Sequence, residues 1–181
     1  MIYFAMTAWL PTLLIDVVSL DRRTAGVGLS VFQLLGIAGT LMAPPLATRM
    51  HRQRALAVGL AVLAAVSLVG LLALPSVWPL WAAIGGLAVG AALGTATTLI
   101  VLRTRHATTT RRLSAMAQTG AYAIAACGPV AVGALHDATG TWTAPLIMLL
   151  AVAGTMAAAG AVCGRRVLID DGAASATWPL P

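Results

Sequence analysis

The sequence predicts an all-α polytopic membrane protein. Hydrophobic residues make up 60% of the 181 residues and charged residues only 9%, which leaves too little polar surface to coat a soluble globule. The apolar residues gather into six runs, each near the roughly 20 residues that a helix needs to cross a hydrocarbon core about 30 Å thick. The runs lack the alternating pattern of strands, so we expect helices.

We expect one six-helix transmembrane bundle over residues 1–164 and a disordered cytoplasmic tail over residues 165–181. The expected spans are about 1–20, 25–48, 55–74, 78–102, 114–135 and 143–164.

The first span is short, because only Met1 to Ile15 precedes Asp16. That charge-free part would cover about 22 Å, less than the hydrocarbon core. We therefore expect the chain to start inside a helix, which Pro11 kinks or unwinds.

Glycines predict how two later spans behave. The fourth span carries Gly86, Gly90 and Gly94 at four-residue spacing, a pattern that lets another helix approach closely. The fifth span carries Gly128-Pro129 and further glycines on either side, so we expect that helix to bend.

Arginines predict the orientation. All 11 basic residues are arginines, and they concentrate in 49–54, 103–112 and 165–166, whereas 75–79 has no charge and 136–142 has only Asp137. Cytoplasmic loops carry the excess of basic residues. Although 21–23 adds two arginines on the other side, the balance predicts a multi-pass protein of the cell membrane with both termini in the cytoplasm.

Neutral polar side chains are the candidate site residues, because no charged residue lies inside the last five spans. The second span carries Ser30, Gln33 and Thr40 on one face, and the fifth carries Ser114, Gln118 and Tyr122 on another. For Ser30, Thr40, Thr97 and Thr98 we expect helix packing. For the two glutamines we favour a lining role, since a large amide needs hydrogen-bonding partners.

The aromatic residues Tyr3 and Trp9 leave two interpretations open, because both lie in the first span near Pro11. Each could contact core or lipid, or line a pocket. The predicted substrate-binding residues are Trp9, Gln33, Gln118 and Tyr122.

Several function classes are disfavoured. The basic residues form no face with interleaved aromatic residues, so no nucleic-acid partner is expected. Two cysteines lie in separate runs without a ligand motif, and His136-Asp137 has no nucleophile nearby. We therefore expect no enzyme activity, no catalytic residue, no metal and no cofactor; the expected partners are the lipid bilayer and a small-molecule substrate.

Four blocks between Ala8 and Trp142 carry a resemblance to a known family. They are Ala8-Trp9-Leu10-Pro11-Thr12, Leu29 to Gly36, Leu46 to Arg49 with Gln53-Arg54, and Leu113 to Gln118 through Gly128-Pro129 to Trp142. The chain resembles the major facilitator superfamily, and within it the cyanate and nitroimidazole transporter branch.

The resemblance implies the C-terminal half of such a transporter, whose seventh to twelfth helices would match the six spans. Ala47-Thr48-Arg49 with Arg54 is similar to a cytoplasmic loop signature, with Thr48 in place of an acid. Family members bind substrate between two halves near mid-membrane, which on this chain would favour the four predicted residues.

We expect transport of a small polar or weakly anionic molecule by alternating access, as the truncated C-terminal half of a secondary transporter. The expected protein partner is a missing N-terminal six-helix half or a second copy. The alternative is a non-transporting membrane assembly protein or an inactive fragment.

Overall fold

The computed structural model describes residues 1–49, 53–102, 104 and 106–163, and helices are the regular elements in them. In chain order these are α1 (Ile2–Val18), α2 (Arg22–Arg49), α3 (Gln53–Ala73), the short 3-10 helix η1 (Pro75–Val77), α4 (Trp78–Leu102), α5 (Ala107–Thr139) and α6 (Thr143–Cys163). Five helices, α2 to α6, are long and apolar enough to cross a membrane. The predicted all-α polytopic class is confirmed; the predicted tail at 165–181 lies outside the described residues.

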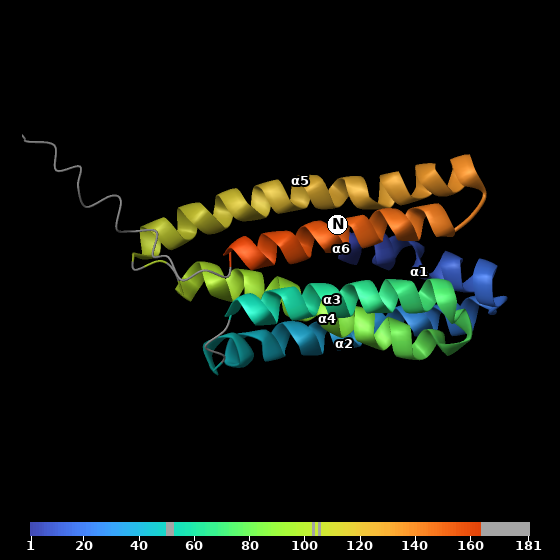
Figure 1. The fold of residues 1–181 in the computed structure, drawn as a ribbon, viewed down its shortest axis with the longest axis horizontal. Coiled ribbons are helices and arrows are strands. Elements are labelled where there is room, and N and C mark those ends of the chain that lie inside the picture. Colours follow the sequence, from blue (N-terminus) through green and yellow to red (C-terminus); the bar gives the residue numbers. More distant parts are fainter. Residues whose placement is uncertain (50–52, 103, 105, 164–181) are drawn as a thin grey trace, which may run out of the picture.

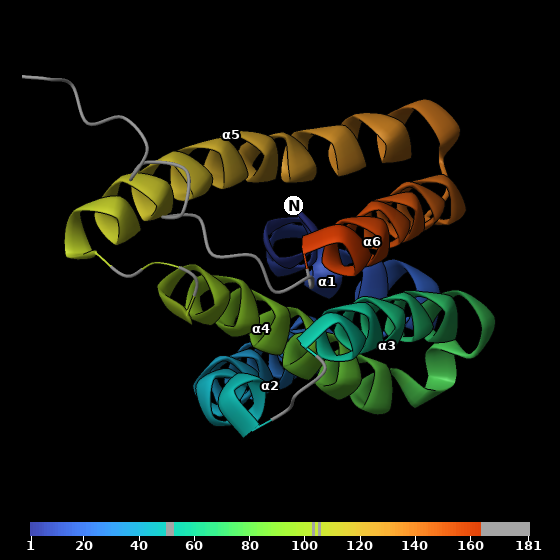
Figure 2. The same cartoon turned by 60° about the vertical axis from the view of Figure 1, so that its left-hand side comes forward.

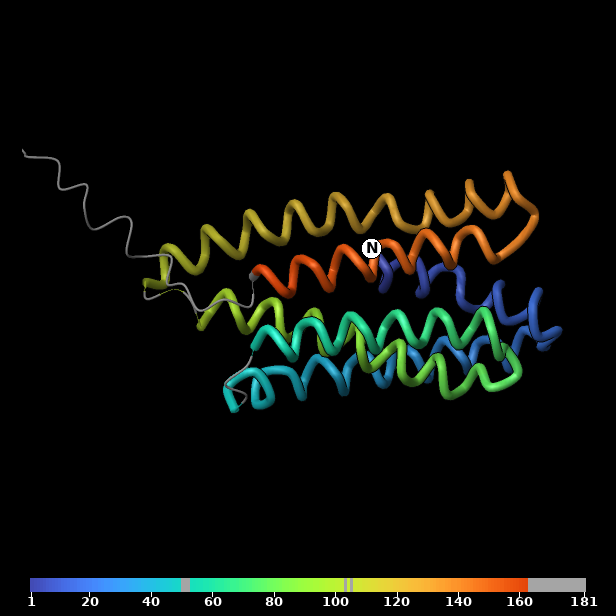
Figure 3. Tube along the Cα trace, viewed as in Figure 1, coloured from blue at the N-terminus to red at the C-terminus, as the bar shows by residue number. Residues whose placement is uncertain are grey.

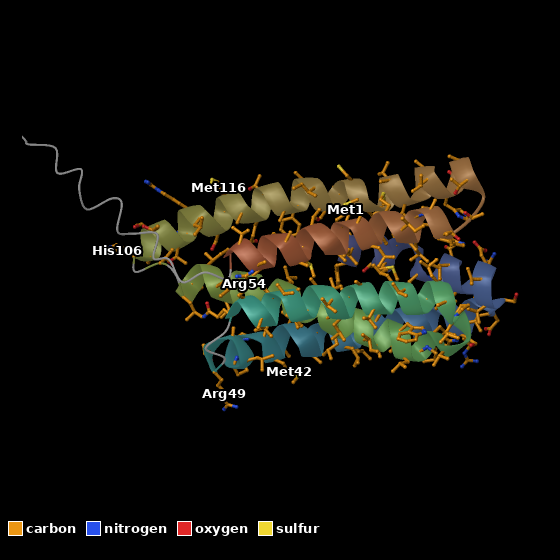
Figure 4. The ribbon with its side chains drawn as sticks, viewed as in Figure 1. Met1, Met42, Arg49, Arg54, His106 and Met116 are labelled. Atoms are coloured by element: carbon orange, nitrogen blue, oxygen red, sulfur yellow. The ribbon has the colours of Figure 1, made fainter. Side chains whose placement is uncertain are left out.

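The six α-helices run along one long axis in alternating directions (Figure 1). We name the two ends of the bundle by residues found there. The Arg49 end, on the left in Figure 1, holds Arg49, Arg54 and His106, as Figure 4 shows. The Trp142 end, on the right, holds the turns that lead into α2, α4 and α6.

Helix α1 begins midway along the bundle, where the N label stands in Figures 1 and 3, and runs to the Trp142 end. Its 17 residues correspond to about 26 Å at 1.5 Å per residue. It packs against both α2 and α5, so it separates these two helices over its length. The helix is continuous through Pro11, so the unwinding considered from the sequence does not occur.

Helices α2 and α4 pack most closely, and glycine makes this contact. Added β-carbons at Gly86 and Gly90 would overlap the carbonyl oxygens of Phe32 and Gly36, and one at Gly94 would lie 2.6 Å from that of Thr40. The close approach predicted from the four-residue glycine spacing is confirmed. Small residues let helix backbones meet in a membrane, where dispersion forces and hydrogen bonds drive packing.

The main core lies toward the Trp142 end and draws side chains from all six α-helices. It includes Leu10, Leu14, Phe32, Leu68, Leu71, Ala82, Val132, Trp142, Leu146 and Leu149. Near the Arg49 end, a second and smaller cluster joins only α2, α3 and α4. The bundle is therefore well packed at one end, whereas α5 stands apart at the other (Figure 2).

Candidate functional site

One side-chain oxygen on α1 and one on α2, those of Thr7 and Gln33, are covered and have no hydrogen bond partner among the described residues. Tyr3, one turn before Thr7, packs against Phe32 and lies beside Gly36, the residues that flank Gln33 along α2. Burying a polar group without a hydrogen bond partner costs about 1–3 kcal/mol. A ligand or a water molecule that hydrogen-bonds to these oxygens would remove that cost.

Four aromatic rings run across the bundle from α2 through α1 to α5. The ring centroids of Phe32 and Tyr3 are 6.0 Å apart, those of Tyr3 and Phe4 5.5 Å, and those of Phe4 and Tyr122 6.2 Å. The last two pairs meet edge to face, a favoured arrangement of aromatic rings. We call these four residues the aromatic run. Tyr3 and Phe4 lie at the start of α1, which begins midway along the bundle. The aromatic run therefore lies at about half the length of the bundle.

The predicted residues Gln118 and Tyr122 lie on an open stretch of α5. All ten residues from Ala115 to Ile124 are exposed. Figure 4 shows Met116, in this stretch, pointing away from the other helices. The Trp142-end part of α5 differs, because Ala125, Gly128, Val132 and Gly133 are buried against the bundle.

The predicted residue Trp9 packs against the second half of α5. Its indole N–H donates to the Pro129 carbonyl at 2.8 Å. A β-carbon on Gly133 would lie 2.7 Å from the indole ring. The indole donor is thus already used within the protein, and the missing side chain of Gly133 makes room for the ring.

A second aromatic cluster joins α1, α5 and α6 at the Trp142 end. The Trp142 N–H donates to the Asp16 carboxylate at 3.0 Å, and the His136 ring stacks on Trp142 with centroids 4.1 Å apart. Trp9 lies behind it, 6.0 Å from Trp142 between centroids. The Trp142 side chain is buried between helices.

The structure brings the four predicted residues to three different places. The Tyr122 ring meets Phe4 of α1, and Gln33 follows Phe32 along α2, so both adjoin the aromatic run. Gln118 lies one helical turn from Tyr122 toward the Arg49 end. Trp9 lies at the α1–α5 contact. The stripes of Gln33 and Gln118 do not face each other directly, because α1 lies between α2 and α5.

Sequence reasoning missed Phe4 and Thr7. Phe4 is an isolated ring in an apolar span, a pattern that lipid contact also explains. The four-residue spacing of Tyr3 and Thr7 places them on one face of α1. This spacing was the available signal for a polar and aromatic face of α1.

Metal-ligating side chains do not cluster in the described residues. Residues 1–49, 53–102 and 106–163 contain no group of three or more His, Cys, Asp and Glu side chains placed to hold a metal. The groups that do gather at mid-length are neutral amides, hydroxyls and aromatic rings. Such groups bind a solute by stacking and hydrogen bonds.

The chain is similar in sequence to proteins named as transporters. It is 37% identical over 166 residues to the protein of Bacillus subtilis (strain 168) named uncharacterized transporter YycB, covering 91% of this chain and 41% of that protein. It is 34% identical over 165 residues to the 2-nitroimidazole transporter of Escherichia coli (strain K12), covering 91% of this chain and 42% of that protein.

The chain therefore spans about two-fifths of the length of these relatives. No family model matches the sequence. No solved structure matches it either. Together, the fold and the comparisons show that the chain is a multi-pass helical membrane protein whose relatives are named as transporters.

Proposed function

We propose that this chain is the C-terminal half of a secondary transporter of the major facilitator superfamily, in the cyanate and nitroimidazole branch. It carries a small polar or weakly anionic molecule across the cell membrane by alternating access, with both termini in the cytoplasm. The observation that carries the proposal is the open stretch of α5, whose exposed Gln118 and Tyr122 adjoin an aromatic run at mid-length.

The open stretch supports a partner at this face. Exposed apolar residues can meet lipid, but an amide in hydrocarbon needs hydrogen-bonding groups or water. The relatives are more than twice as long as this chain, which supports a missing N-terminal six-helix half over a second copy. Alternating access rocks one bundle against another around a central site.

We propose distinct roles for the four predicted residues. Gln33, Gln118 and Tyr122 contact the substrate, because Gln118 and Tyr122 are exposed and the covered oxygen of Gln33 has no hydrogen bond partner among the described residues. Trp9 holds α5 against α1 behind the site, since Pro129 already accepts its only hydrogen bond donor.

Reconstitution in proteoliposomes tests the proposal. The DNA directly upstream is first translated in all frames to find six further spans, which are then co-expressed with this chain. Entry of 2-nitroimidazole, the solute named for one relative, is expected with both halves. Gln118→Leu and Gln33→Leu are expected to reduce entry at least tenfold; this effect corresponds to a loss of about 1.4 kcal/mol.

A non-transporting assembly protein is the competing function, supported by the glycine contact of α2 and α4. It predicts that neither glutamine variant changes the activity of the assembled complex. Entry through vesicles that contain this chain alone would instead favour a second copy as the partner.

A further inference from the structure

The turn between α5 and α6 places one indole ring between an acid and an imidazole. The Trp142 N–H donates to the Asp16 carboxylate of α1 at 3.0 Å, and the His136 ring of α5 stacks on the indole with an interplanar angle of 22°. The Trp142 carbonyl accepts the backbone N–H of Leu146 in α6 at 3.1 Å. The indole is buried, the histidine partly buried and the aspartate exposed. One buried residue therefore joins three helices, and both titratable groups that contact it are reachable from solvent.

Three features of this geometry hold a positively charged His136 more tightly than a neutral one. A cation over the face of a tryptophan is attracted by the electrons of the ring. The Asp16 carboxylate, which accepts the N–H of the same indole, adds a negative charge nearby. His136 also lies in the last turn of α5, where the helix dipole attracts a cation. All three act in the same direction, so protonation strengthens the contacts of this residue.

Protonation also fixes the direction of one hydrogen bond. His136 Nδ1 lies 3.3 Å from the Thr141 carbonyl oxygen. A neutral imidazole carries its proton on one of its two nitrogens, whereas the charged ring donates from both. The charged ring therefore always donates to Thr141, the residue before Trp142. This bond adds a link between α5 and the turn that carries the indole.

The charged groups on the surrounding elements are few. Thr143 to Val162 of α6 include no charged or titratable side chain, and on α1 the N-terminal amine and Tyr3 lie at the opposite end of the helix from Asp16. The other charged side chains of the described residues at the Trp142 end are all exposed: Asp137 next to His136, and Asp21, Arg22 and Arg23 before and at the start of α2. Asp137 is thus the neighbouring acid whose removal serves as a control.

We infer that His136, Trp142 and Asp16 form a pH-sensitive latch, which ties the Trp142 ends of α1, α5 and α6 more tightly when His136 carries a proton. Imidazole side chains change their charge between about pH 5 and pH 8, so the latch tightens at the lower value and loosens at the higher one. It holds one end of α5, a helix whose stretch from Ala115 to Ile124 is exposed. In the orientation proposed above, the Trp142 end faces the outside of the cell, and this side assignment alone rests on the proposed function.

Hydrogen exchange of the Trp142 indole N–H tests the latch. Its protection factor is measured by NMR on the full chain in detergent micelles and corrected for the intrinsic exchange rate at each pH. Protection is expected to be roughly two- to fivefold larger at pH 5 than at pH 8, the fold-change that corresponds to a partly exposed cation–π contact. The Trp81 indole, which donates to the neutral Leu74 carbonyl at 3.0 Å, is the internal control and should be equally protected at both values.

Variants assign the pH dependence to His136. His136→Phe keeps a stacked ring without a charge, and His136→Gln keeps a hydrogen bond donor without either; both should make the protection of Trp142 independent of pH. Asp137→Asn should keep the dependence of the wild type. Asp16→Asn should lower the protection at both pH values, because the indole then donates to a neutral acceptor.

Three results would overturn the latch: equal protection of Trp142 in the wild type at pH 5 and pH 8, larger protection at pH 8, or a pH dependence that survives both His136 variants. The latch and the proposed transport fail separately, because the exchange measurement needs neither a second half nor a solute. A latch that responds to pH without solute entry in the assembled protein would remove transport alone. Solute entry with a pH-independent Trp142 would remove the latch alone.

Discussion

Helices α2 and α5 carry the same kinds of residue but have opposite surroundings. Both have glycines and a glutamine on a polar face, yet α2 is held against α4 by Gly36 and Gly90, and Thr40 donates to the Gly90 carbonyl at 3.0 Å. On α5, a β-carbon added at Gly120 would meet no atom within 4 Å. A glycine face therefore indicates that a helix can approach, not that one has done so.

Gly36 and Gly39 of α2 are part of a packed contact with α4. The open stretch of α5 has no such contact, because its residues are exposed. In α2 the space beside these two glycines is already filled by α4, so substitutions there should reduce the stability of the fold. In the open stretch of α5, changes should spare folding and affect only what later contacts the helix. Four predictions run from the largest expected effect to the smallest, and the first and third test this contrast directly.

Gly90→Leu should destabilise the protein by about 3 kcal/mol, because the new side chain overlaps the Gly36 backbone and forces α2 and α4 apart. Gly120→Leu is the matched control on α5, with open space around it, and should cause no loss. Circular dichroism during denaturation in mild detergent measures both. Equal losses for the two variants would show that α5 is packed there too.

Trp142→Phe should cost about 1.5 kcal/mol, since it removes a hydrogen bond to the Asp16 carboxylate from a buried ring. Trp81→Phe is the control, because it removes an indole bond to the neutral Leu74 carbonyl at 3.0 Å; it should cost less. The same denaturation assay compares them. A larger loss for Trp81→Phe would contradict the importance of the charged acceptor at the Trp142 end.

Gln33→Leu should stabilise the protein by about 1 kcal/mol, because it replaces a buried oxygen that has no partner with an apolar group. Gln118→Leu, in the open stretch, should leave the free energy of unfolding unchanged. A loss of stability in Gln33→Leu would mean that a partner already satisfies this amide. Both variants should still impair solute entry, which separates binding from folding.

The smallest effect should be a pH dependence at the start of α2. Asp21 accepts hydrogen bonds from the backbone amides of Arg23 and Thr24 at 3.0 and 3.2 Å, and its pKa is lowered chiefly by the side-chain hydrogen bond with Thr24. A lowered pKa in the folded state means that Asp21 adds stability above its ordinary pKa of 3.8. That stability disappears as the pH falls through the lower, folded value.

Asp21→Asn should remove this part of the pH dependence. Midpoints of unfolding, compared between pH 7 and pH 3, should fall more for the wild type than for the variant, by a small amount because Asp21 is exposed. Parallel curves for the two proteins would contradict a stabilising role for the ionised carboxylate.

Much of the architecture was predictable because it depends on local patterns. Apolar run lengths predicted helices long enough to cross a membrane, and Gly86, Gly90 and Gly94 predicted a close helix contact. The stripe containing Gln118 and Tyr122 was also readable, since helical periodicity places residues on one face. The sequence was less informative about partners, because lipid tails and neighbouring helices are equally compatible with an apolar face.

Length, composition and periodicity of the sequence alone determined an all-α polytopic membrane protein; its exact spans and its polar faces stay predictions. Only the tertiary structure decided that α1 lies between α2 and α5 and that the Phe4 ring connects Tyr3 to Tyr122. It also decided that the Trp9 indole donates its hydrogen bond to the Pro129 carbonyl. The physical reason is that periodicity fixes which residues share a face of one helix. Which helix meets that face depends on contacts between residues up to 126 positions apart.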